Sequence, residues 1–485
     1  MKEGFVGIPY PENIRFTGDT VDFNKLGLKL DGVEFGRSEA ELFKERLELP
    51  NGNFKVSTMR IGALGEEGFR MELKRDSLEI YGGAEAAVHY AFEVIRAMVI
   101  ARDGILNTFT LDDKPYFAHR GLLLDSARHF MPARYVYALL DVMSILRLNR
   151  FHMHLTDDQG WRIEIPSRPE IAKIGGARKN PIMNLDEMLP AQYYTVEELK
   201  GIVEYARKRH IEIIPEIDMP GHMVSLLASH PEIGCGKDHY DVATLWGVSK
   251  DVLNPGKEET YEILEDVIRT VSEIFPSGLM HYGGDECPTD ACIVNPECMA
   301  LMEKMGYTDE RQIQGYFADR ISAIMDKYNL KPVSWEETAH GKPSVKPLLQ
   351  VWLGGEHVSE YSEEGYNMII STCTDGAYMD YRPMNDEWQG GIYGDNSLLK
   401  SYNIKLDYPL PGSGKIIGGE GALWTEHVEF PYQASVQLFP RLAALSEAFW
   451  FGNRERNFTR FLRNAESFQK ILDSCGIRTR VLLDF

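Results

Sequence analysis

Residues 121–155 read GLLLDSARHFMPARYVYALLDVMSILRLNRFHMHL, and this stretch decides the fold class. Two short apolar runs, residues 121–125 and 150–155, flank residues 133–149, whose apolar side chains recur at helical spacing. Parallel strands that are covered by helices are apolar throughout, because neither of their faces meets water. The stretch therefore predicts a strand, a crossover helix and a second, parallel strand.

The same order of strand and helix recurs along the chain. Six further strand-like runs occupy residues 211–217, 279–284, 331–335, 348–354, 366–372 and 415–424, which makes eight in total. Helices are expected at residues 195–210, 257–275, 309–329 and 436–450. Eight such units over about 340 residues predict an α/β fold of the (β/α)8 TIM barrel type.

We expect three parts of the chain. Residues 1–113 are predicted to form a small α+β domain, because residues 68–73 and 77–82 alternate like half-exposed strands and residues 84–98 have a helical pattern. The catalytic barrel is assigned to residues 114–455. Residues 456–485 are expected to add a helix over residues 457–476, ended by Gly476, and a tail packed on the barrel.

Composition and charge exclude several classes of protein. The 485 residues carry 52 Lys and Arg against 73 Asp and Glu, a formal net charge of −21, which argues against a nucleic-acid partner. The first residues lack the basic and apolar segments of a secretory signal, and no run reaches the roughly 18 apolar residues of a membrane span. We expect a cytoplasmic protein without a membrane partner, or a secreted one if a leader was removed.

Six cysteines are few for this length, and reduced thiols are the expectation for that compartment. Cys287, Cys292 and Cys298 lie close together in sequence, but their spacings do not match the C-x2-C pattern of a zinc site. Buried or loop thiols are therefore the prediction for this group.

Acids and tryptophans end most of the predicted strands, where the active site of a (β/α)8 barrel lies. They are Asp125, Asp157, Asp158, Glu216, Asp218, Asp285, Glu286, Trp335, Glu336, Trp352, Asp375, Asp380, Glu420, Trp424 and Glu426. Carboxylates accept hydrogen bonds from sugar hydroxyls and flat rings stack on a pyranose. The set favours a glycoside as the substrate, and glycoside cleavage also needs a protonated carboxyl as proton donor.

Asp285 and Glu286 are the sharpest local signal. Gly283 and Gly284 precede them and let the backbone bend out of the strand. Adjacent acids cannot easily occupy opposite faces of a sugar, as the usual two-carboxylate mechanism demands. The pair therefore indicates one proton donor and one orienting partner, with the nucleophile supplied from elsewhere.

His152 and His154 offer an alternative, because an H-x-H pair on a strand directs both rings to one side, as in metal-dependent hydrolase barrels. That alternative also requires histidines at the ends of later strands. The last four predicted strands end without one. Hydrogen-bonded structural histidines are the preferred interpretation.

At these residues the sequence resembles the family 20 glycoside hydrolases, the β-N-acetylhexosaminidases. The matching motifs lie at residues 120–130, 151–161, 215–222, 281–286, 335–336, 378–380, 420–426 and 439–447, within a similarity that runs from about residue 68 to 450. The family also has a small α+β domain before its barrel.

The resemblance implies substrate-assisted catalysis with retention and without metal or cofactor. The oxygen of the substrate's own 2-acetamido group would attack the anomeric carbon and form an oxazolinium intermediate. Glu286 would act as general acid and then as general base. Asp285 would hold the acetamido N–H, and the Tyr378 hydroxyl would hold the acetamido oxygen.

The resemblance also assigns residues to the rest of the sugar. Arg120 would bind the 3- and 4-hydroxyls, and Asp380 and Glu426 the 4- and 6-hydroxyls. Trp335, Trp352 and Trp424 would enclose the acetamido methyl and the ring. Asp158, with Asp157 as the alternative, would support Glu286 through His222.

The expected partners are glycosides of N-acetylated amino sugars, and the chain is expected to be a monomer or a homodimer. Terminal β-linked GlcNAc is the predicted unit, with GalNAc as a second substrate. A catalytically inactive carbohydrate-binding protein on the same scaffold would normally have lost Asp285, Glu286 or Tyr378. Residues 381–414 match no motif, so the side of the site that meets the leaving group stays open.

Overall fold

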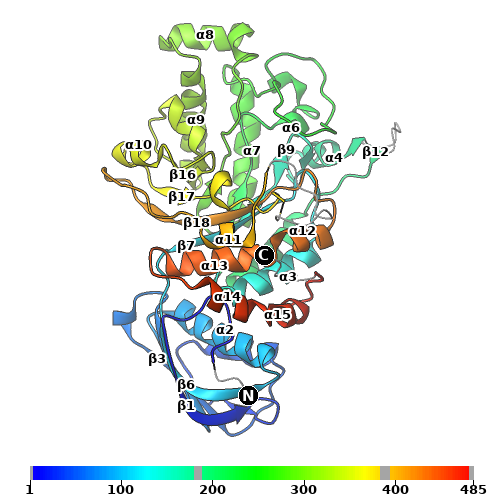
Figure 1. The fold of residues 1–485 in the computed structure, drawn as a ribbon. Coiled ribbons are helices and arrows are strands. Elements are labelled where there is room, and N and C mark those ends of the chain that lie inside the picture. Colours follow the sequence, from blue (N-terminus) through cyan, green and yellow to red (C-terminus); the bar gives the residue numbers. More distant parts are fainter. Residues whose placement is uncertain (1–3, 180–187, 383–393, 480–485) are drawn as a thin grey trace.

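The computed structural model describes residues 4–179, 188–382 and 394–479. A twisted sheet near the N-terminus lies at one end of the molecule, and a barrel surrounded by helices forms the rest (Figure 1). Helix α2 (Glu85–Ala101) lies between them, which explains why it is buried on nearly all sides rather than along one stripe.

The N-terminal sheet has six strands in the order β1-β6-β4-β5-β3-β2. Their bounds are β1 (Asn13–Asp22), β2 (Leu28–Lys29), β3 (Phe54–Arg60), β4 (Phe69–Leu73), β5 (Ser77–Gly82) and β6 (Ile105–Asp113), with α1 (Arg37–Arg46) beside α2. β4 and β5 pair antiparallel and alternate between buried and more exposed positions, as their sequence pattern predicts. The buried positions pack under α2 in a separate apolar core that includes Phe69, Met71 and Phe92.

Eight parallel strands close the barrel, which confirms the predicted (β/α)8 fold. They are β7 (His119–Asp125), β8 (Arg150–His154), β13 (Glu212–Glu216), β14 (Leu279–His281), β15 (Lys331–Trp335), β16 (Leu348–Val351), β17 (Met368–Ile370) and β18 (Ile416–Leu423). β18 pairs with β7 and so completes the ring. Each coincides with a predicted apolar run.

The main outer helices are α3 (Ala133–Ile145), α5 (Val196–Arg207), α7 (Glu258–Ile274) and α9 (Arg311–Lys327). Shorter elements occupy the loops, namely β9 (Thr156–Asp157), β10 (Gly160–Trp161), α4 (Pro169–Gly175), β11 (Arg178–Lys179), β12 (Met188–Leu189), α6 (Val224–Leu227), α8 (Pro296–Met305), α10 (Val358–Glu363) and α11 (Leu398–Tyr402), with 3-10 turns η1 (Gly62–Leu64), η2 (Pro231–Ile233), η3 (Cys292–Val294), η4 (Glu336–Gly341) and η5 (Cys373–Asp375). No helix in the described ranges is both long enough and apolar enough to cross a membrane.

Two predicted helices are each divided in two. The helix expected at residues 436–450 is α12 (Pro431–Leu438) and α13 (Arg441–Phe451), because Phe439 is extended and Pro440 has no N–H to donate. The helix expected at residues 457–476 is α14 (Phe458–Ala465) and α15 (Phe468–Ser474), followed by Gly476 with φ +76°.

Candidate active site

A pocket of about 450 Å³ opens where the barrel strands end. Its walls are Arg128, His222, Trp246, Gly247, Val248, Asp285, Glu286, Trp335, Trp352, Tyr378, Asp380, Tyr381, Trp424 and Glu426. Nine of these side chains were predicted from the sequence. They lie at or after the ends of six different strands, and Arg128 follows a seventh, so closing the barrel is what brings them together.

A bent loop after β14 presents the two adjacent acids. Gly283 and Gly284 have φ of +71° and +93°, and a Cβ on Gly283 would lie 1.6 Å from Asp218 Oδ1. Asp218 also accepts a hydrogen bond from Gly284 N, at 3.1 Å. Glu286 itself has φ +41°, a strained value that is uncommon for a residue with a side chain. The loop is thereby fixed so that the Glu286 side chain stays partly exposed in the pocket.

Asp285 is largely buried beside Glu286. Burial raises the pKa of Asp285 to about 6. His222 acts in the opposite direction and lowers this pKa, whereas the negative charges of Glu216 and Glu286 raise it. Asp285 Oδ1 has no hydrogen-bond partner among the residues that the structure describes. A buried acceptor of this kind is suited to an N–H donor on a bound ligand.

His222 connects this pair to the barrel. Its Nε2 lies 3.5 Å from Glu286 Oε2, and its Nδ1 is hydrogen-bonded to Asp157 Oδ1 at 3.2 Å. Burial alone would lower the pKa of His222, but Asp157 in particular raises it well above the usual range. A protonated ring can then donate on both sides.

The hydrogen-bond partner of His222 is therefore Asp157, the alternative to the predicted Asp158. Asp158 Oδ2 lies 3.6 Å from the same nitrogen, and its Oδ1 accepts the backbone N–H of Val224. Asp157 also contacts Arg128 and His154, each at 2.9 Å, so it lies at the centre of a charged cluster.

Aromatic rings form the wall that faces the acids. Trp335 and Trp424 are 5.8 Å apart between ring centroids, and Trp352 lies nearly parallel to Tyr378 at 6.2 Å. Trp335 donates its indole N–H to Glu216 at 2.9 Å, and Trp352 donates to Glu337 at 3.0 Å. These hydrogen bonds fix the rings, and burial raises the pKa of Tyr378 well above its usual range, so its hydroxyl stays protonated and able to donate.

Asp380, Glu426 and Arg128 form the polar part of the pocket. Burial raises the pKa of Asp380 well above its usual range, and the negative charge of Glu426 raises it further. Asp380 Oδ1 has no hydrogen-bond partner in the described chain. Arg128 Nη2 lies 3.9 Å from Glu426 Oε1, and its guanidinium stands 5.2 Å from the Trp424 ring centroid. This part offers both donors and acceptors to hydroxyl groups.

The structure contradicts the prediction that Arg120 binds the sugar hydroxyls. Arg120 lies near the start of β7, at the end of the barrel that faces the N-terminal sheet, and it is fully buried. Its guanidinium donates to both carboxylate oxygens of Glu67, at 2.8 and 2.9 Å. Arg128 follows the end of the same strand and lines the pocket. The direction of the strand predicts this, because the active site of a (β/α)8 barrel lies where the strands end.

Sequence reasoning also missed Trp246, Val248 and Tyr381, which lie on irregular loops without a recognisable pattern. Tyr381 belongs to the unmatched stretch 381–414, and residues 383–393 of that stretch lie outside the described residues. The nearby acid Glu337 also follows β15 but has no role in the predicted site; burial first, and then Asp285, raise its pKa to about 8.

His152 and His154 take part in hydrogen bonds inside the barrel. His152 contacts Glu420 at 2.8 Å and Glu216 at 3.0 Å, and His154 contacts Glu216 at 2.5 Å and Asp157 at 2.9 Å. Each ring nitrogen thus lies within 3.0 Å of a carboxylate oxygen, and the structural role of both histidines stays a prediction.

Comparison with known proteins places the chain in a family. Residues 117–453 match the model of the glycosyl hydrolase family 20 catalytic domain. A β-hexosaminidase of Porphyromonas gingivalis is 29% identical over 450 residues, which cover 90% of this chain and 57% of that protein. A β-hexosaminidase of Vibrio furnissii is 31% identical over 407 residues, covering 79% and 65%.

Solved structures agree with this match. The exo-β-N-acetylglucosaminidase of Vibrio harveyi, solved in complex with N-acetylglucosamine, aligns with a TM-score of 0.84 at 25% identity, over 99% of this chain and 79% of that chain. The chain spans about three fifths of the length of the two curated relatives above. The family model covers more than two thirds of the sequence, including all the barrel strands and the pocket residues, so the chain belongs to glycosyl hydrolase family 20.

Proposed function

We propose that this chain is a retaining exo-β-N-acetylhexosaminidase that releases terminal, non-reducing β-linked GlcNAc, and also GalNAc. The observation that carries the proposal is the Asp285–Glu286 pair in a pocket walled by tryptophans and Tyr378. The names of the relatives, and the N-acetylglucosamine in the Vibrio harveyi complex, support this substrate class.

The spacing of the pair disfavours an inverting mechanism, and its position on one loop disfavours either acid as the nucleophile. Oxygens of Asp285 and Glu286 lie within 4.8 Å of each other, whereas the carboxyls of an inverting pair stand ~6.5–9.5 Å apart. The two acids also leave the same loop, so they approach a sugar from one side. The acetamido oxygen of the substrate can then attack the anomeric carbon from within the pocket.

In the first step Glu286 gives its proton to the glycosidic oxygen as the bond to the anomeric carbon breaks. The acetamido oxygen forms a new bond to that carbon, and the acetamido group gains positive charge. Asp285 accepts a hydrogen bond from the acetamido N–H and stabilises this charge. The Tyr378 hydroxyl donates a hydrogen bond to the acetamido oxygen and orients it.

In the second step Glu286 removes a proton from water, which attacks the anomeric carbon and opens the oxazolinium ring with net retention. His222 positions Glu286 for both proton transfers, with Asp157 behind it. Trp335, Trp352 and Trp424 enclose the methyl group and exclude bulk water.

The outer part of the pocket accounts for recognition of the remaining sugar. Arg128, Asp380 and Glu426 are assigned to the 3-, 4- and 6-hydroxyls, with Arg128 in the role first given to Arg120. Trp246, about half exposed at the pocket, offers a ring to the leaving group.

The test compares aryl β-N-acetylglucosaminide with the matching aryl β-glucoside. Only the acetamido sugar should be hydrolysed, and the Glu286→Gln variant should lose ~10²–10⁴-fold in kcat. Equal rates on the two sugars would exclude the substrate-assisted mechanism. Binding of N-acetylglucosamine without hydrolysis by the wild type would indicate the inactive carbohydrate-binding alternative.

A further inference from the structure

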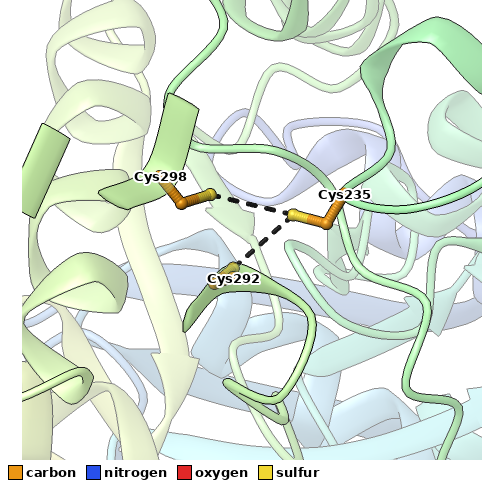
Figure 2. Close-up of side chains that lie close together, drawn as sticks. All are labelled: Cys235, Cys292 and Cys298. Carbon is orange, nitrogen blue, oxygen red and sulfur yellow. Dashed lines mark hydrogen bonds between the residues drawn. The ribbon is translucent and has the colours of Figure 1, made fainter. Parts of the chain in front are cut away.

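Three cysteine sulfurs meet outside the active site (Figure 2). Cys235 Sγ lies 3.6 Å from Cys292 Sγ and 3.8 Å from Cys298 Sγ, and all three sulfurs lie within 4.8 Å of one another. All three side chains are buried, in a small apolar cluster with Val252 and Ile313. Since Cys235 is 57 residues from Cys292 along the chain, local spacing could not reveal this group.

The cysteines come from two successive barrel loops. Cys235 lies in the long connection between β13 and α7, whereas Cys292 begins η3 and Cys298 lies in the first turn of α8, both in the loop after β14. This second loop also carries Asp285 and Glu286, and Cys292 follows Glu286 by six residues. The cluster therefore joins a neighbouring loop to the one that presents the acids.

The distances between the sulfurs fit one tetrahedral metal ion. Zn–S bonds of ~2.3 Å place two sulfurs of a tetrahedral site ~3.8 Å apart. A disulfide needs ~2.05 Å between two sulfurs and would leave the third cysteine alone. The convergence of three thiols on one point is thus explained better by metal binding than by disulfide formation.

Hydrogen bonds with neighbouring asparagines hold the cysteines in place. Asn295 caps α8 by accepting the backbone N–H of Cys298 at 3.1 Å, and its Nδ2 donates to the carbonyl of Cys235 at 2.9 Å. Cys298 Sγ lies 3.2 Å from Asn254 Oδ1, so an amide oxygen is also available as a donor.

We propose that Cys235, Cys292 and Cys298 bind a Zn²⁺ ion that ties the loop after β13 to the loop carrying Asp285 and Glu286. Binding displaces the thiol protons, and the three thiolates coordinate the metal while a fourth position takes an oxygen donor. Thiolate ligands select zinc over the hard cations Mg²⁺ and Ca²⁺. The role is structural, because no step of hydrolysis uses this ion.

The test measures metal in the full-length protein. Protein purified without chelator should hold about one zinc per chain by elemental analysis, and the apoprotein titrated with Co²⁺ should show a thiolate-to-cobalt charge-transfer band at about one ion per chain. Cys235→Ser and Cys298→Ser should abolish the band. Cys475→Ser, which replaces a buried thiol elsewhere, should leave it unchanged.

Absence of the cobalt band in the wild type, or an equal band in Cys235→Ser, would overturn the proposal. Four rather than six titratable thiols in unreduced, denatured protein would do the same, because they would identify a disulfide. If the serine variants do not fold, the wild type decides alone. Its Tm should fall on metal removal and return with added Zn²⁺, and an unchanged Tm together with no bound zinc contradicts the site. None of these measurements depends on glycosidase activity.

Discussion

Asp285 combines a buried position with a role that needs negative charge. Because burial raises its pKa to about 6, half of the carboxyl groups are ionised at that pH and most of them above it. We expect kcat/KM on an aryl N-acetylglucosaminide to fall as the pH is lowered through about 6, approaching tenfold per pH unit below it. A profile of kcat/KM against pH measures this, and a flat profile down to pH 4.5 would contradict the assigned role.

The same pKa makes Asp285 costly for stability. Its folded-state pKa exceeds the ordinary 3.8, so the folded protein binds the proton more tightly and loses stability as the pH rises between these values. Asp285→Asn should therefore raise the free energy of unfolding at pH 7 by about 1–3 kcal/mol while activity is lost. Asp290→Asn, an exposed acid on the same loop, is the control and should change neither.

The two neighbouring acids Asp157 and Asp158 make different contacts, and a matched pair of variants separates them. Asp157 bonds to His222, whereas Asp158 bonds to a backbone N–H. Asp157→Asn should reduce kcat by about 10–100-fold, because a positioning partner of the acid is lost. Asp158→Asn should reduce it less, and the reverse order of kcat would restore the original assignment.

At the scale of elements, the turn after β14 depends on a glycine. A Cβ at position 283 would overlap Asp218, and the φ of +71° is unfavourable for any other residue. Gly283→Ala should lower the free energy of unfolding by about 2–4 kcal/mol, measured by denaturant titration. Gly62→Ala, where a Cβ meets nothing within 4 Å, should stay within about 0.5 kcal/mol of wild type.

The eight strands could be predicted because buried parallel strands are continuously apolar, and each predicted run overlaps one. Helix ends follow less directly from the apolar pattern. The break at Phe439–Pro440 could have been predicted from the proline, but the apolar pattern continues across it and the helix was extended through it. The break between α14 and α15 has no such marker in the sequence.

At the scale of the whole molecule, acids and tryptophans at strand ends could be predicted as pocket residues because closing the barrel decides their position. Arg120 was assigned to the pocket although it stands at the start of a strand, and Cys235 joins its partners only through the folding of two loops. Packing between distant segments decides both cases. We also propose the division of the chain at residues 113 and 114, and again near residue 455, as domain boundaries.

Arg120 instead connects the N-terminal sheet region to the barrel through Glu67. Burial would raise the pKa of Glu67, but Arg120 lowers it below the ordinary 4.5. The pair therefore stabilises the fold above pH 4.5 and loses this effect as the pH falls through the lowered pKa. Glu67→Gln should cost about 3 kcal/mol at pH 7, because the buried guanidinium loses its countercharge.

Denaturant titration of the wild type and Glu67→Gln at pH 7 and at pH 4 tests this role of Arg120. The difference in the free energy of unfolding should shrink at the lower pH, while KM for the N-acetylated substrate stays the same at pH 7. Glu66→Gln, an exposed neighbour, should change neither quantity. A raised KM with unchanged stability in Glu67→Gln would contradict this role. Sugar binding, rather than the contact between the N-terminal sheet region and the barrel, would then depend on the Arg120–Glu67 pair.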